Sequence, residues 1–128
     1  MGQPAAKQGD QITATDTHVV VIPTGTSTLT FPFAGQLSGG LSNDVKIMGK
    51  PAAVVGSTAD NTPPHLLQPP ATSFSKPPSN KGTIQSGSQT VKINGKPAAR
   101  NGDPAVTCND PVDLAVGTVK ATGTVMIG

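Results

Sequence analysis

The chain has 128 residues, which is enough for one domain with a modest hydrophobic core. It has no tryptophan or tyrosine and three phenylalanines, so large aromatic side chains are not its main source of stability. Its net charge of +2 is spread along the chain without basic runs, which disfavours a nucleic-acid-binding protein. With no signal-peptide pattern and no membrane-length apolar run, we expect a chain that is soluble in the cytoplasm when made.

A nine-residue pattern, G-x-P-A-A-x-x-G-[DS], occurs three times along the chain. The copies start at Gly2, Gly49 and Gly95, which are separated by 47 and then 46 residues. A fixed period of this size is typical of a repeat architecture. The repeat-motif residues that we single out are Pro4, Ala5, Ala6, Pro51, Ala52, Ala53, Pro97, Ala98, Ala99 and Arg100.

A V-x-I segment leads into the second copy at residues 45–47 and into the third copy at residues 91–93. The first copy has no such lead-in before it. The missing segment stands at the other end of the chain, at residues 125–127. We therefore expect the C-terminal strand to lie beside Gly2, so that the termini meet and three units close into a ring with pseudo-threefold symmetry.

The local patterns predict an all-β fold. Alternating V-x-I runs with flanking Gly, Asn, Asp and Ser indicate short strands and turns, and no stretch of ten residues has the spacing of an amphipathic helix. We expect one domain over residues 1–128, with units at about 1–34, 35–81 and 82–128, the C-terminal strand completing the first unit. Residues 19–34 and 66–81 are expected to be long connections, the second a stiff, proline-rich loop on the outside.

The histidines and the cysteine of the chain fall one in each unit, as His18, His65 and Cys108. Each follows its repeat proline, by 14 residues for the two histidines and by 11 for the cysteine. Equivalent positions in a closed ring converge on its axis, and two imidazoles with one thiolate are the borderline-soft donors of a zinc-type site. The alternative is that the histidines are exposed turn residues and the cysteine a small buried apolar group.

Three ligands leave one coordination position open. Water or a carboxylate such as Asp16, Asp60 or Asp110 would suit it, and the pattern does not choose between them. A bound metal would tie the three units together and offset the small core.

A catalytic role for these residues has little support in the sequence. A nucleophilic Cys108 would need His18 or His65 as a free base, whereas a metal-bound thiolate is not a free nucleophile. Neither the G-x-x-x-x-G-K-[ST] phosphate loop nor the G-x-S-x-G nucleophile motif occurs. We therefore expect a protein that is not an enzyme.

The third copy reads P-A-A-R literally at residues 97–100, and degenerate copies stand at 4–7 and 51–54. In this the chain resembles the PAAR-repeat proteins, over essentially its whole length. The resemblance implies a cone of β-hairpins whose broad base sits on the blunt end of a trimeric β-helical spike, as in type VI secretion, with zinc near the vertex. It also implies assembly in the cytoplasm followed by export with the injection apparatus, or by an extracellular location.

From the resemblance we expect one copy for each spike trimer, a monomer when free, and a possible role in attaching effector cargo. Family zinc sites usually combine three histidines with one cysteine, and this chain departs from that set because it has two histidines. An alternative is a metal-binding β adaptor, or a phage baseplate or tail-spike tip, that uses the same cone to bind another trimeric partner.

Overall fold

The computed structural model of the chain describes residues 2–62, 64–110 and 112–128, and this part contains strands and no helix. The predicted all-β, cone-like class is thus confirmed. The strands are β1 (Gln3–Pro4), β2 (Gln11–Ile22), β3 (Gly25–Gly39), β4 (Lys46–Ile47), β5 (Lys50–Pro51), β6 (Thr58–Asn61), β7 (Ser73–Phe74), β8 (Lys81–Ile84), β9 (Lys92–Ile93), β10 (Lys96–Pro97), β11 (Pro104–Thr107), β12 (Leu114–Lys120) and β13 (Met126–Ile127). No helix long and apolar enough to cross a membrane is found among the described residues.

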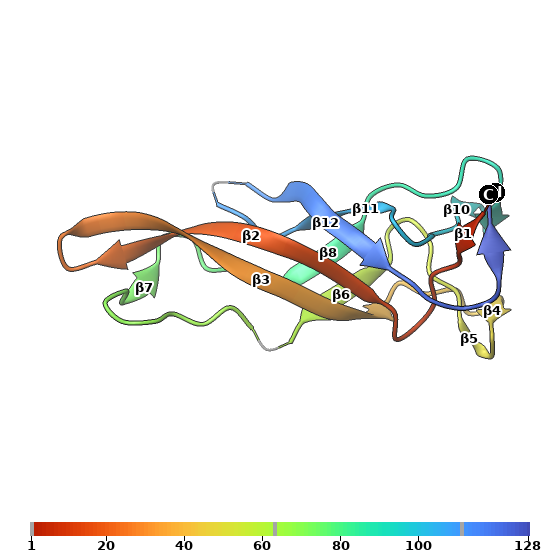
Figure 1. Cartoon of the computed structure of the whole chain (residues 1–128), viewed down its shortest axis with the longest axis horizontal. Coiled ribbons are helices and arrows are strands. Elements are labelled where there is room, and N and C mark those ends of the chain that lie inside the picture. Colours follow the sequence, from red (N-terminus) through yellow and green to blue (C-terminus); the bar gives the residue numbers. More distant parts are fainter. Residues whose placement is uncertain (1, 63, 111) are drawn as a thin grey trace.

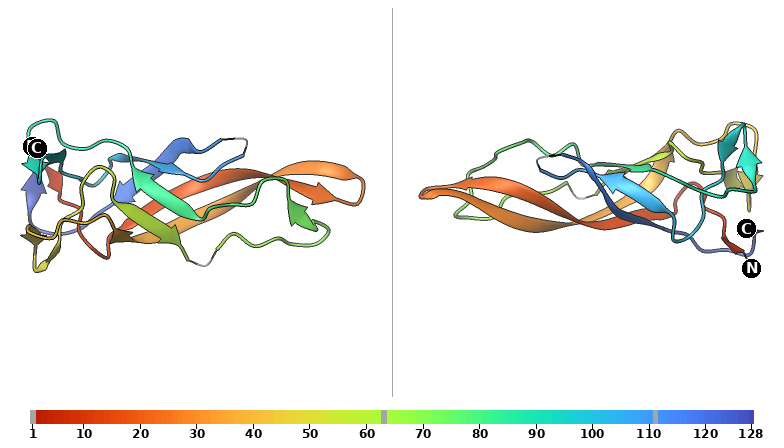
Figure 2. Two further views of the ribbon diagram at one scale, coloured as in Figure 1. Left: turned by 180° about the vertical axis from the view of Figure 1, so that it is seen from behind. Right: turned by 90° about the horizontal axis from the view of Figure 1, so that it is seen from above.

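The molecule is elongated and tapers from one end to the other (Figure 1). Short paired strands and both chain termini occupy the broad end, and the long β2–β3 hairpin projects at the narrow end. The views from behind and from above agree on this arrangement (Figure 2).

Six strands in the middle of the molecule form a closed antiparallel sheet in the order β12-β11-β8-β6-β3-β2. The pairing of β12 with β2, in which Thr118 faces Thr13, closes it. Each repeat contributes one outgoing strand (β2, β6 or β11) and one returning strand (β3, β8 or β12), so the threefold pattern extends into this sheet. Its interior is filled by apolar side chains, and the buried cluster includes Ile12, Phe33, Leu37, Ile84 and Val119.

Three equivalent two-stranded pairs form the broad end, which we call the hairpin ring: β4–β5, β9–β10 and β1–β13. The first two are tight hairpins whose central residues have positive φ, at Met48 and Gly49 and at Asn94 and Gly95. The third joins the two ends of the chain, with Gln3 facing Ile127. The predicted closure of the ring by the C-terminal strand is therefore confirmed.

The alanine pair of each repeat explains why the motif needs small residues. Ala6 donates its N–H to the carbonyl of Ala99 at 2.9 Å, Ala99 donates to Ala53 at 3.0 Å, and Ala53 donates back to Ala6 at 3.0 Å. This cycle of backbone hydrogen bonds brings the three units together. The six alanines are at most 1% exposed, so no larger side chain has room there.

The residue after the repeat glycine caps the turn in each unit, and in two units it is an aspartate, Asp10 or Asp103. Each carboxylate accepts the backbone N–H three residues earlier, from Lys7 at 3.0 Å and from Arg100 at 2.6 Å. Both carboxylates also pair with the basic side chain of that residue. In the second repeat Ser57 caps the turn with its hydroxyl group, and no charge pair forms.

The expectation that residues 19–34 form a connection is wrong. Strand β2 continues to Ile22 and β3 begins at Gly25, with paired residues from Gln11↔Gln36 to Ile22↔Gly25. The β-branched run 19–22 extends the hairpin because such residues favour strands. Residues 66–81 do form a connection on the outside, although β7 within it pairs with β2.

Candidate metal centre

Four buried side chains come together in the structure: Asp16, His18, His65 and Cys108. Their candidate ligand atoms all lie within 4.8 Å of one another. We call them the four-residue cluster. The structure thus brings together the three residues singled out from the sequence and adds a carboxylate.

The cluster draws on all three units, but unequally. Asp16 and His18 are two residues apart on β2, so both point to the same face of that strand. His65 follows β6, and Cys108 comes directly after β11. Strand β2 continues past the cluster to Ile22, so the β2–β3 hairpin projects beyond it.

The carboxylate of Asp16 takes part in the hydrogen bonds of the other residues at this site. One carboxylate oxygen accepts from Nε2 of His65 at 2.7 Å, and the thiol of Cys108 lies 3.5 Å from the same oxygen. The other oxygen accepts from the hydroxyl group of Thr107. The carboxylate is fully buried, so its charge depends on these donors, or on a cation, for compensation.

His18 lacks such partners. Both ring nitrogens are buried without a well-formed hydrogen bond among the described residues. The ring instead stacks edge-on against Phe31 and Phe74, with centroids 5.7 and 5.6 Å away. Burial and the neighbouring His65 lower the pKa of His18, against opposing effects of Asp16, Asp110 and the backbone of Cys108. The imidazole is therefore neutral near pH 7, which is the form that binds metals.

Cys108 is 2% exposed, and burial is the main cause that raises its pKa. The backbone of Asn80 acts in the opposite direction. Without a cation the thiol therefore keeps its proton at neutral pH. A bound metal ion would displace that proton, because a coordinating thiol is deprotonated.

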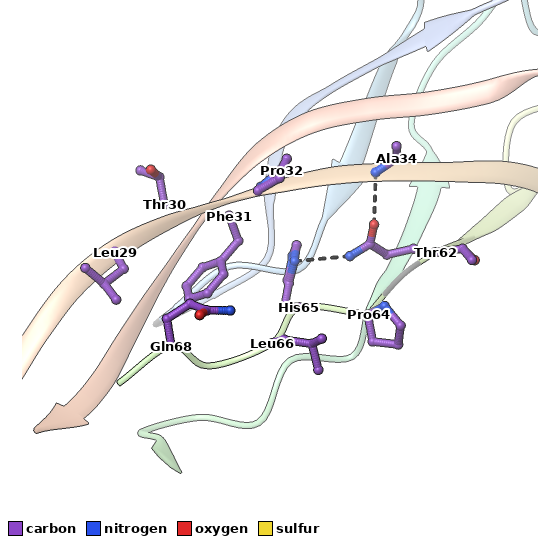
Figure 3. Close-up of a pocket in the computed structure, with 11 residues that line it drawn as sticks. Leu29, Thr30, Phe31, Pro32, Ala34, Thr62, Pro64, His65, Leu66 and Gln68 are labelled. Atoms are coloured by element: carbon purple, nitrogen blue, oxygen red, sulfur yellow. Dashed lines mark hydrogen bonds between the residues drawn. The ribbon is translucent and has the colours of Figure 1, made fainter. Parts of the chain in front are cut away.

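His65 is held through its ring and through its backbone. Its Nδ1 lies 3.1 Å from the amide nitrogen of Asn61, and its backbone N–H donates to Oδ1 of Asn80 at 2.8 Å. Figure 3 shows this ring at the wall of an apolar groove of about 540 Å³ between β3 and the segment that follows β6.

The PAAR motif family model matches residues 75–128, which contain the third repeat and the terminal strand that closes the ring. The same motif repeats at equivalent places in the other two units of the structure. This match supports a PAAR-repeat protein. The PAAR motif is associated with spike-tip proteins of contractile injection systems. A search of curated proteins found no match.

The donor set of the four-residue cluster suits a metal ion. Two imidazoles, a thiol and a carboxylate are the ligand types of tetrahedral zinc sites. The buried nitrogens of His18 have no better partner in the described structure.

Of the three carboxylates left open by the sequence, the structure places Asp16 in the cluster. Asp60 is exposed, and Asp110 is partly buried with one oxygen that has no partner in the described part. The spacing of Asp16 and His18 on one strand is the signal that would have found it. The supporting residues Asn61, Asn80 and Thr107 had no signal in the sequence.

Proposed function

We propose that this chain is a non-catalytic tip that caps the blunt end of a trimeric β-helical spike in a contractile injection system. The observation that carries the proposal is the hairpin ring. A single chain presents three similar β pairs around one axis, which is the symmetry needed to fit the end of a three-chain partner. Attachment of effector cargo, and export with the apparatus after assembly in the cytoplasm, belong to the same proposal.

Exposed apolar side chains at the hairpin ring support an interface there. Met48 is 53% exposed in the β4–β5 turn, and Met126 is 56% exposed on β13. Covering such side chains with a partner removes apolar surface from water and stabilises the complex. The free protein is a monomer in this proposal, because the ring is already closed within one chain, and it binds as one copy per spike trimer.

We also propose that the four-residue cluster binds zinc and that the ion is structural. The hydrophobic interior is small, and a shared ion would tie β2 to the segments that follow β6 and β11. His18, His65 and Cys108 would hold it, with Asp16 as the fourth ligand. The ion contributes stability and no reaction step.

Co-expression with the trimeric spike protein encoded in the same genome tests the cap. We expect a complex of one copy per three spike chains by native mass spectrometry. Met126→Glu should abolish it, because a charge would be buried in an apolar contact.

Leu66→Glu is the matched control, since Leu66 is 64% exposed but lies outside the hairpin ring. This variant should bind as the wild type does. A stable homotrimer of the free chain, or equal loss of binding in both variants, would contradict the cap.

A further inference from the structure

The side-chain amide of Asn61 has one orientation that satisfies its neighbours. Its Oδ1 accepts the backbone N–H of Ala34 at 2.9 Å. The amide nitrogen therefore faces Nδ1 of His65 at 3.1 Å and Oδ1 of Asn80 at 3.2 Å. Figure 3 draws the two bonds that link Ala34 and His65 through this amide.

This orientation decides where His65 carries its proton. An amide NH₂ group only donates, so Nδ1 must accept with its lone pair. In a neutral imidazole the proton then lies on Nε2, which donates to Asp16 at 2.7 Å. The metal-free network is fully satisfied at Asn61 and His65.

A metal ion on Nε2 reverses this requirement. It takes the Nε2 lone pair, so the proton must move to Nδ1, where metal-bound imidazoles need an acceptor. Asn61 presents a donor there. Turning the amide round would supply an oxygen, but it would also remove the acceptor from the N–H of Ala34.

We propose that Asn61 weakens zinc binding by the cluster, because it stabilises the metal-free arrangement in which His65 is bonded to Asp16. The inference rests on the proposed zinc site. Asn61 is a positioning residue here, acting through His65 rather than on the ion.

Asn61→Asp tests the proposal. One carboxylate oxygen keeps the bond from Ala34, and the other replaces the amide nitrogen with an acceptor for Nδ1–H. Zinc affinity, measured by competition with a chromogenic chelator at about pH 8 where protons compete little for imidazole, should rise by about 10-fold or more, the usual scale for outer-shell partners. Asn101→Asp is the matched control, because Asn101 also accepts a backbone N–H, from Ala121 at 3.0 Å, but contacts no cluster residue.

A second measurement reports the position of the His65 proton directly and does not depend on zinc affinity. Nitrogen-15 spectra of labelled histidine should show the His65 proton on Nε2 in the metal-free wild type and on Nδ1 after zinc is added. Equal affinity of wild type and Asn61→Asp, or a metal-free His65 with its proton on Nδ1, would overturn this proposal alone. If neither protein binds zinc, the zinc site and this proposal fall together.

Discussion

The hairpin ring and the four-residue cluster hold the same three units together by different means. Next to the ring, backbone groups of Ala6, Ala53 and Ala99 bond in a cycle, and every unit contributes the same atoms. In the cluster, four different side chains meet, and two of them come from β2. The three units are therefore closely threefold-symmetric where backbone groups make the contacts. They lose that symmetry where side chains make the contacts.

The difference teaches why the motif is so short. Backbone bonding at the ring constrains each repeat to a turn and small residues, so Pro-Ala-Ala recurs. A metal-type cluster does not require the same residue from each unit, since imidazole, thiolate and carboxylate groups can all serve as ligands. The repeats therefore diverge as they leave the ring.

The largest expected effect comes from the cluster. Cys108→Ser should lower zinc content and melting temperature together, because a serine hydroxyl is a poor zinc ligand at neutral pH. Structural zinc contributes apparent binding free energies on the order of 10 kcal/mol in small domains. Chelation of the wild type should move its melting curve toward that of the variant.

Hydrogen exchange makes this test specific to one region. Metal removal should expose amides of β2, β6 and β11 near the cluster, while the amides of Ala6, Ala53 and Ala99 stay protected. Two measurements together would contradict the structural-zinc proposal. The protein purified without added metal would hold less than about 0.2 ion per chain, and its melting temperature would not change when a chelator is added.

The sequence predicted the ring better than the cluster, for a physical reason. The V-x-I segments and the three G-x-P-A-A copies encode local turns and strands, so the closure at β1–β13 followed from counting repeats. The convergence of His18, His65 and Cys108 also followed from their placement, one in each unit. Asp16 is one of three carboxylates that the sequence leaves open, and the folded arrangement chooses it, whereas Asn61 has no signal in the sequence and only the folded arrangement reveals it.

The alanine cycle next to the ring should be sensitive to volume rather than to charge. Ala53→Leu adds a side chain where Ala53 is 0% exposed, and it should cost about 3 kcal/mol or more of unfolding free energy by overpacking. Ala115→Leu, at an exposed position of β12, is the control and should change little. Urea unfolding of both variants measures the difference. Similar stability of the two variants would mean that the chain is not tightly packed around Ala53.

The smallest effect concerns the basic residue of the motif, for which the second repeat provides a template. Arg100 pairs with Asp103 at 2.9 Å, and their side chains are 26% and 6% exposed. Arg100→Ala leaves that largely buried carboxylate without its charged partner, and we expect a loss of about 1 kcal/mol of unfolding free energy because the pair is partly screened.

The double change Arg100→Val with Asp103→Ser copies Val54 and Ser57, where a hydroxyl group caps the turn without any charge. It should therefore restore stability to within about 0.5 kcal/mol of wild type, the usual range for neutral substitutions. Urea unfolding of the wild type, the single variant and the double variant measures the coupling. If the double variant is less stable than Arg100→Ala, the arginine has a role beyond locking its own turn.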